Sequence, residues 1–342
     1  MLKHRKSVIG LDIGTSCIKA VEVTQDKFDY TITAYGQVDV SGEQARHEAI
    51  SDLFAGGGFN TRRVATAVSG KSVIFRYINM AQMNPESLQN AIRYEADQYI
   101  PFETDDVQLD THKLMDIPSE DGDEDEMKVL LVAAKNSLVE DHAQMLVDLG
   151  LQPVSVGVDS FALGNAFELG DTVSPGIQGS DRTVALLDIG SSKSSINIIQ
   201  NNVTCFAREV PMGGQELTNA ITRRFAIESG EAEALKRDPQ EQMSEVQDAV
   251  LHVMDDLGNE VNLSFDFFEN QFDGDVEEVY LSGGSVLLPF LEESLETIFE
   301  KKTRVWNPID GLKVRSDNVD VDQLQLAGPQ LAVALGLAAP VA

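Results

Sequence analysis

The sequence is poor in cysteine and in basic residues, and it has no long apolar run. Its two cysteines, Cys17 and Cys205, are too few and too far apart for a disulfide framework or a zinc site. No run of eighteen apolar residues occurs, and the basic start, MLKHRKS, passes straight into a strand-like segment rather than a signal peptide. We therefore expect a soluble, cytoplasmic protein without a membrane-spanning helix.

Acidic residues outnumber basic ones by 56 to 26, so the formal net charge is −30. Nucleic-acid binding draws most of its affinity from Lys and Arg on phosphates, and no basic stripe is visible. This charge argues against nucleic acid and anionic lipid as partners. The densest acidic run, SEDGDEDE at 119–126, is either a docking site for a basic partner or a solvated hairpin loop.

What the sequence does contain is a repeat. Residues 8–23, VIGLDIGTSCIKAVEV, and residues 184–199, VALLDIGSSKSSINII, each predict an apolar strand, a small polar turn and a second strand. A single such turn would be unremarkable, but both copies share Leu-Asp-Ile-Gly followed by hydroxyl residues. A repeat half a chain apart predicts two domains, each presenting one turn, and 42% hydrophobic residues are enough to bury a core in each.

The chemistry of these turns favours phosphate binding. Gly14 and Gly190 let the backbone approach an anion, and the hydroxyls of the turns add donors. A carboxylate beside a phosphate is repelled unless a divalent cation or its water shell lies between, so Asp12 and Asp188 predict Mg²⁺. A third segment, the strand at 276–282, ends in Ser-Gly-Gly-Ser before a helix, which suits contact with a nucleoside. We predict Mg-ATP in a cleft between the domains. The hydroxyl and glycine residues concerned are Thr15, Ser16, Ser191, Ser192, Gly283, Gly284 and Ser285.

This order of motifs resembles the superfamily of actin, hexokinase and heat-shock-chaperone ATPases. Within it, the chain is most similar to the PilM family of type IV pilus assembly proteins and to the related FtsA. The similarity rests on AIRYEADQYIPFETDDVQLD at 91–110, VSVGVDSFAL at 154–163, PMGGQELTNAI at 211–221 and PQLAVALGLA at 329–338. It implies an α/β, actin-like (ribonuclease H-like) two-domain ATPase fold with an inserted α+β subdomain.

The resemblance also implies residue roles. Asp12 and Asp188 would hold magnesium through water, and Lys19 would contact the β- and γ-phosphates, although it also fits an exposed strand position. Asp159 aligns with the residue that orients the attacking water, but it is one methylene shorter than glutamate, so we expect a weak ATPase or none. Further residues of the nucleotide site would be Gly213, Gly214, Glu233 and Lys236, the last two of which a charged helix surface explains nearly as well.

The expected organisation follows from periodicity and from the same resemblance. Residues 1–69 and 151–182 would form the first actin-like domain, and residues 183–342 the second, with the last helix, near 323–338, packing back toward the first. Residues 70–150 read as β-α-β-β-α, in which Asn84 caps a helix that starts at Pro85, and they would form the inserted subdomain. Residues 170–181 would link the domains.

Three functions remain open at this point. The first is an ATP-binding scaffold of a type IV pilus, or of a related pilus or secretion machine, at the inner membrane. The family's partner is the cytoplasmic N-terminal peptide of a PilN-like bitopic membrane protein, and pilus motor ATPases and self-association are further possibilities. Aromatic residues at the end of the insert's first helix would grip the peptide, unless they form the subdomain core. The alternatives are a filament-forming FtsA-like cytomotive ATPase and a small-molecule kinase. The aromatic candidates are Tyr94, Tyr99 and Phe102.

Overall fold

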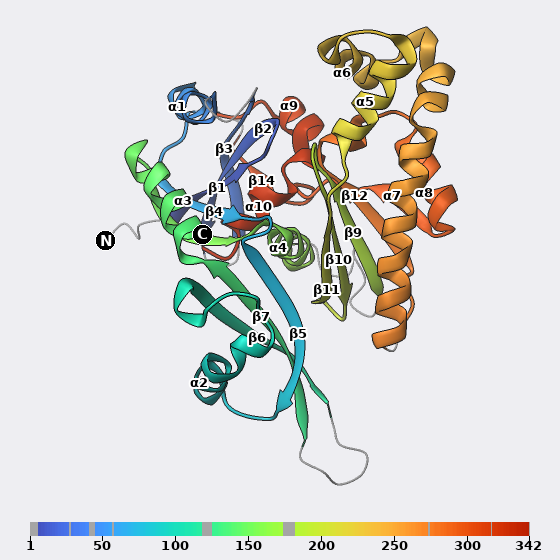
Figure 1. The fold of residues 1–342 in the computed structure, drawn as a ribbon. Coiled ribbons are helices and arrows are strands. Elements are labelled where there is room, and N and C mark those ends of the chain that lie inside the picture. Colours follow the sequence, from blue (N-terminus) through green and yellow to red (C-terminus); the bar gives the residue numbers. More distant parts are fainter. Residues whose placement is uncertain are drawn as a thin grey trace.

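The computed structural model describes residues 6–26, 29–40, 45–56, 58–117, 125–173, 182–272, 274–315 and 317–341. The expected linker from residue 174 on, and residues 119–124 of the acidic run, lie outside this description. In the described part, two sheet-based lobes lie side by side, and a smaller unit projects from the first of them (Figure 1).

The first lobe is built on a six-stranded sheet in the order β14-β3-β2-β1-β4-β8. Strands β1, β2 and β3 form an antiparallel meander, whereas β4 pairs with β1, β8 with β4 and β14 with β3 in parallel. One face packs against α1 and α3 and the other against α9 and α10. The strands are β1 (Lys6–Ile13), β2 (Cys17–Asp26), β3 (Asp29–Asp39), β4 (Arg63–Val68), β8 (Gln152–Val158) and β14 (Lys313–Val314). The helices are α1 (Ala45–Gly56), α3 (Asn136–Asp148), α4 (Asp159–Val173), α9 (Val321–Ala327) and α10 (Ala332–Ala338).

The second lobe repeats this pattern. Its five-stranded sheet has the order β11-β10-β9-β12-β13, with an antiparallel meander followed by two parallel strands. On helix α7, buried apolar residues recur every three or four positions, and they pack on the sheet together with α5 and α8. The strands are β9 (Thr183–Ile189), β10 (Ser194–Gln200), β11 (Val203–Val210), β12 (Glu278–Ser282) and β13 (Lys302–Val305). The helices are α5 (Gly214–Phe225), α6 (Ser229–Arg237), α7 (Met243–Gln271) and α8 (Leu291–Phe299).

The projecting unit has the first four elements predicted for the insert, β-α-β-β, whereas the predicted fifth element, α3, packs on the sheet of the first lobe. Its three-stranded antiparallel sheet, in the order β5-β7-β6, is covered by α2. Asn84 caps α2 as expected, because its side chain accepts a hydrogen bond from the Ser87 N–H at 2.9 Å, and Pro85 is the first helical residue. Its own apolar cluster holds this unit together. The elements are β5 (Val73–Ala81), α2 (Pro85–Glu95), β6 (Val107–Ile117) and β7 (Glu126–Lys135).

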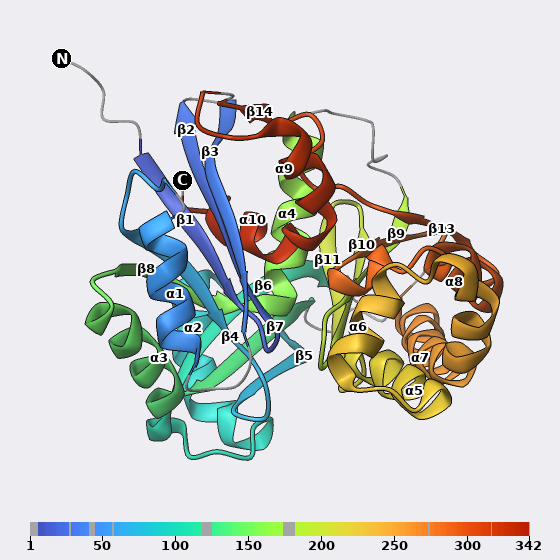
Figure 2. The ribbon, with the colours of Figure 1, turned by 90° about the horizontal axis from the view of Figure 1, so that it is seen from above.

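Two helices join the lobes. Helices α4 and α10 lie between the sheets (Figure 2), and they pack so closely that a Cβ at Gly336 would overlap the carbonyl oxygen of Ala162. On the other side of α4, Phe167 meets Tyr280 of β12 and Trp306 edge to face, at centroid distances of 5.5 and 5.6 Å. The lobes therefore share a continuous apolar contact.

The actin-like, two-lobed α/β fold with an inserted α+β unit is confirmed. One helix prediction was wrong in detail: the continuous helix expected near 323–338 is two helices, α9 and α10, separated by a 3₁₀ turn at Gly328–Gln330 that contains Pro329. Strands β13 and β14 were also missed, because both are short and neither contains a continuous or alternating apolar segment long enough to indicate a strand. The domain boundaries drawn from the sequence stay a prediction.

Candidate functional site

The two repeated turns meet. The first turn connects β1 to β2 and the second connects β9 to β10, and each projects from the end of its sheet toward the other lobe. Thr15 Oγ1 donates to Ser192 Oγ at 3.2 Å, and Ser16 Oγ donates to Ser191 Oγ at 2.5 Å. Segments 176 residues apart in the sequence thus form one polar site between the lobes.

Charged groups of both lobes gather beneath these turns. Lys19 lies opposite Asp12 in the hairpin register, and its ammonium is 3.0 Å from Asp12 Oδ2. Burial alone would lower the pKa of Lys19, but Asp12 and Asp188 outweigh it and raise that pKa above its ordinary value. Burial raises the pKa of Asp188, and Lys19 and a hydrogen bond from Ser282 oppose this rise. The alternative interpretation of Lys19 as an exposed strand residue was wrong, since only 14% of its side chain is exposed.

Closely packed glycines surround the second turn. Gly214 N–H donates to Gly190 O at 2.8 Å, and Ser285 Oγ approaches the same carbonyl at 3.3 Å. A Cβ at Gly213 would lie 2.6 Å from Gly190 O, so the start of α5 can approach the turn only without a side chain. The segments around 190, 213 and 285, which were predicted separately, are therefore in direct contact.

Gly283 and Gly284 differ sharply in their surroundings. Gly283 has φ +93°, and a Cβ there would lie 2.5 Å from the carbonyl oxygen of Ile189, directly before the second turn. Around Gly284, by contrast, an added Cβ would meet nothing within 4 Å. Next to them, Ser282 pairs in register with Asp188 and donates to its Oδ1 at 2.8 Å.

Lys236 lies against Gly214, and Glu233 is its ion-pair partner. The Lys236 ammonium donates to Glu233 Oε2 at 2.6 Å, to Thr218 Oγ1 at 2.8 Å and to Gly214 O at 3.1 Å. Burial lowers the pKa of Lys236, and Glu233 only partly opposes this. With 7% of Lys236 exposed, the interpretation as a charged helix surface is wrong for this residue.

Lys193 was not singled out from the sequence, although it lies inside the repeated motif. Its ammonium is 2.7 Å from Asp159 Oδ2 and 2.7 Å from Glu209 Oε1. Burial raises the pKa of Asp159 to about 6, with Lys193 lowering it and Glu209 raising it. Ser160 Oγ also donates to Glu209, at 3.0 Å. Asp159, the residue expected to orient water, is thus already engaged by a lysine.

The predicted partner-binding aromatics lie apart from this cleft. Tyr94 is 88% exposed on α2, whereas Tyr99 and Phe102 pack against the apolar core of the insert, with Lys135 over the Phe102 ring. Their role in binding a partner stays a prediction.

A groove of about 610 Å³ lies between the insert and the second lobe. Strands β5 and β11, each at the edge of its sheet, line it together with α7. Phe206 stacks against Tyr77 of β5 and lies 5.4 Å from Phe267 of α7 by ring centroids. Leu263 and Phe267 are 55% and 52% exposed there. This apolar surface of α7 was not predicted from the sequence.

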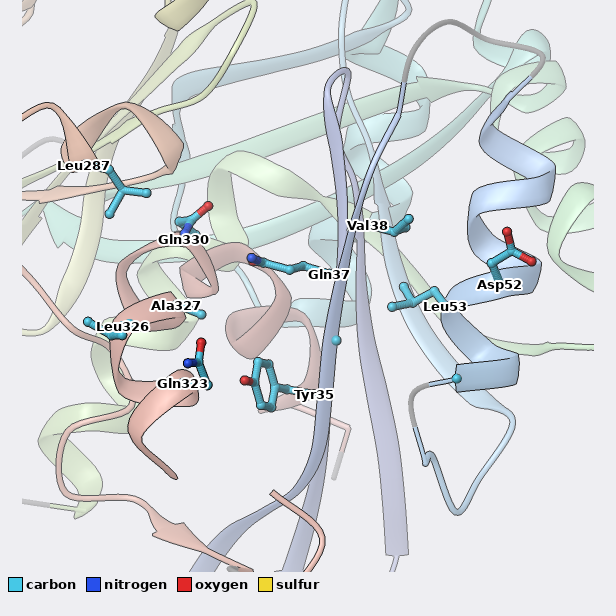
Figure 3. A pocket seen from close by; sticks show the side chains of 12 residues that line it. Tyr35, Gln37, Val38, Asp52, Leu53, Leu287, Gln323, Leu326, Ala327 and Gln330 are labelled. Carbon is cyan, nitrogen blue, oxygen red and sulfur yellow. The ribbon is translucent and has the colours of Figure 1, made fainter. Parts of the chain in front are cut away.

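A second cavity, of about 680 Å³, opens between β3 and α9. In Figure 3, Tyr35 and Gln37 of β3 point toward α9, while Val38 and Leu53 lie on the other side of the strand. Leu287, two residues after Ser285, lies at its far end. No side chain of the predicted site lines this cavity.

Comparison with known proteins decides the family. The sequence profile described as "Type IV pilus assembly protein PilM" matches residues 10–340. This chain belongs to the PilM family. A solved PilM-PilN type IV pilus biogenesis complex is similar over 98% of both chains, with a TM-score of 0.84 and 29% identity.

More distant structures share the fold of this PilM family member. The ethanolamine utilization protein EutJ from Carboxydothermus hydrogenoformans has a TM-score of 0.57 at 17% identity, over 98% of this chain and 89% of its own. MreB5 of Spiroplasma citri has a TM-score of 0.51 at 11% identity, over 97% and 94%. Among the described helices, none is long and apolar enough to cross a membrane.

Proposed function

We propose that this chain is a nucleotide-controlled scaffold of type IV pilus assembly. In this proposal it binds Mg-ATP between its two turns and a cytoplasmic peptide of a PilN-like inner-membrane protein in the groove. Membership of the PilM family supports a role in pilus assembly, and the solved PilM-PilN complex supports a PilN-like partner. The partner would hold the protein at the cytoplasmic face of the inner membrane.

The meeting of the two turns carries the nucleotide part of the proposal. Four carboxylates and two ammonium groups around them have a net charge of −2 when all are ionised, which a divalent cation balances. Asp12 and Asp188 would hold Mg²⁺ through water, and the ion would offset phosphate charge. MreB5, which shares the fold, is solved bound to ADP, in keeping with a nucleotide here. The six groups are Asp12, Asp188, Asp159, Glu209, Lys19 and Lys193.

Turnover would be slow. Asp159 is one methylene shorter than glutamate, and its Oδ1 already accepts a hydrogen bond from the Ser160 N–H at 2.8 Å, so it is poorly placed to accept a hydrogen bond from an attacking water. Nucleotide would then act mainly through the relative pose of the lobes rather than through rapid hydrolysis. The shared contact of α4 with both sheets supports this coupling.

The groove has the properties of a peptide site. Two edge strands expose unpaired backbone groups along it, which an added strand can pair with. The exposed Leu263 and Phe267 offer apolar contact. An extended peptide with apolar side chains on one face fits this surface.

The nucleotide part is tested by thermal unfolding and calorimetry. Mg-ATP at one hundred times its Kd stabilises the fold by about 2.7 kcal/mol. For 342 residues unfolding as a unit this raises Tm by about 4 °C. Asp12→Ala should abolish the rise, whereas Asp29→Ala, which removes an exposed carboxylate paired with Lys313, should keep it. No rise in the wild type, with no heat of binding, would refute the nucleotide site.

The groove is tested with a synthetic peptide of the cytoplasmic N-terminus of the PilN-like protein from the same organism. Leu263→Glu adds a charge inside the groove and should weaken binding at least about tenfold, which is about 1.4 kcal/mol. Leu251→Glu is the matched control, because Leu251 is 48% exposed on the same helix and does not line the groove. Equal affinities of the two variants would place the peptide elsewhere.

A further inference from the structure

Lys193 is held by elements of both lobes. Asp159 is the first residue of α4, which packs between the sheets, and Glu209 belongs to β11, the edge strand of the second sheet. The Lys193 ammonium lies 2.7 Å from a carboxylate oxygen of each. One cation thus ties the turn of the second lobe to the start of α4.

The backbone and the side chain of Lys193 have different freedom. Its carbonyl oxygen accepts a hydrogen bond from Gly190 N–H at 3.0 Å, which closes the turn and fixes the main chain. Its side chain is 28% exposed and reaches its partners through four rotatable methylenes. The ammonium can therefore change partners without any movement of the turn.

A phosphate between the turns would compete for this ammonium. Ser191 and Ser192, which precede Lys193, already touch the first turn, so a terminal phosphate there lies within reach of its side chain. A triphosphate carries more charge than a carboxylate and offers several acceptor oxygens.

The two carboxylates that Lys193 would leave, those of Asp159 and Glu209, lie at or directly beside the groove. Glu209 lines it directly, and so does Val158, the residue before Asp159. Without Lys193, the Glu209 carboxylate loses its ammonium partner and still accepts a hydrogen bond from Ser160 Oγ at 3.0 Å. If Lys193 moved to a phosphate, the charge of Glu209 at the groove would lose its partner, and the position of β11 there would change.

We propose that Lys193 is a ligand of the terminal phosphate, that it distinguishes nucleoside triphosphate from diphosphate, and that its departure from Asp159 and Glu209 passes this difference to the groove. The inference rests on the proposed nucleotide site. It adds Lys193 to that site and connects the site to the groove through Asp159 and Glu209. Coupling of this kind is reciprocal, so an occupied groove also changes triphosphate affinity.

Calorimetry with Mg-AMPPNP and Mg-ADP tests the discrimination. The wild type should bind AMPPNP at least about tenfold more tightly than ADP, as expected for one charged hydrogen bond. Lys193→Met should lose this preference and keep its ADP affinity. Lys301→Met is the matched control, because Lys301 is 23% exposed and also paired, with Glu269, far from the turns. An unchanged preference in Lys193→Met would overturn the proposal.

Amide hydrogen exchange tests the route to the groove. In the wild type and in Lys301→Met, AMPPNP but not ADP should change exchange in β11 and in residues 158–161. Lys193→Met should show no such change. If calorimetry detects AMPPNP binding while β11 exchange stays the same in the wild type, the route is wrong. If neither nucleotide binds the wild type, the proposed nucleotide site itself fails, and this inference fails with it.

Glu209→Gln provides a second variant that does not depend on the stability of Lys193→Met. It keeps the size of the side chain and removes one of the two carboxylates that compete for Lys193. AMPPNP affinity should rise severalfold while ADP affinity stays unchanged. An equal change for both nucleotides would also overturn the proposal.

Discussion

Gly283→Ala should damage the fold and the second turn together. Gly283 has φ +93°, where an L residue is strained by about 1–3 kcal/mol. The new Cβ would lie 2.5 to 2.8 Å from backbone atoms of Ile189, and backbone cannot move aside as a flexible side chain can. Such overpacking costs about 1–3 kcal/mol more.

The expected change in melting temperature follows from chain length. With an unfolding entropy of about 2.1 cal/mol/K per residue, 342 residues give about 0.7 kcal/mol/K. A loss of about 2–6 kcal/mol then lowers Tm by about 3–8 °C. Because Ile189 directly precedes the second turn, nucleotide affinity should fall as well.

Gly284→Ala is the neighbouring control. Its Cβ would meet nothing within 4 Å, so we expect a change in stability within about 0.5 kcal/mol. If the nucleoside lies against Gly284, this variant should still weaken nucleotide binding. Differential scanning calorimetry gives Tm and isothermal titration gives affinity for both variants. Equal Tm values for the two would refute the reasoning about Gly283.

Three further predictions concern Asp159, the apolar contact between the lobes and ATP turnover. Burial raises the pKa of Asp159 from 3.8 to about 6, so between these pH values the folded chain binds a proton that the unfolded chain releases. The Tm of the wild type relative to Asp159→Asn should therefore fall from pH 4 to pH 6.5, and a constant difference would contradict this shift. Phe167→Ala leaves a cavity in the apolar contact between the lobes and should lower the free energy of unfolding, measured with denaturant, by about 3–5 kcal/mol. Leu251→Ala, at an exposed position, should lower it by less than about 0.5 kcal/mol. Steady phosphate release from ATP should stay below about one per second, because Asp159 is one methylene shorter than glutamate and its Oδ1 is held by the Ser160 N–H. A much faster rate would contradict this reasoning.

Local patterns predicted much of the fold. The apolar segments at 8–23 and 184–199 predicted two strands each, and the structure has β1 and β2, and β9 and β10, at these places. Asn84 and Pro85 marked the start of α2 because capping is a local interaction. The break at Pro329 was missed, although a proline inside an apolar helix pattern was the available signal.

Some residues of the candidate site were predicted from the sequence, and Lys193 was not. Asp12, Asp188 and the hydroxyls of both turns were predicted because the motif occurs twice, and the structure places the hydroxyls of the two turns within hydrogen-bond distance of each other. Lys193 was overlooked within the same motif, because its partners Asp159 and Glu209 are 34 and 16 residues away. The only available signal was its position directly after the second turn.

The sequence by itself determined the family, the repeated turns and the order of the elements, since these depend on residues close together in the chain. The tertiary structure alone decided which charges share a partner, that Lys236 is buried, and that β5 and β11 border one groove. The reason is physical: ion pairs, burial and grooves depend on distances between segments that the folded chain brings together, and periodicity along the chain carries no information about those distances.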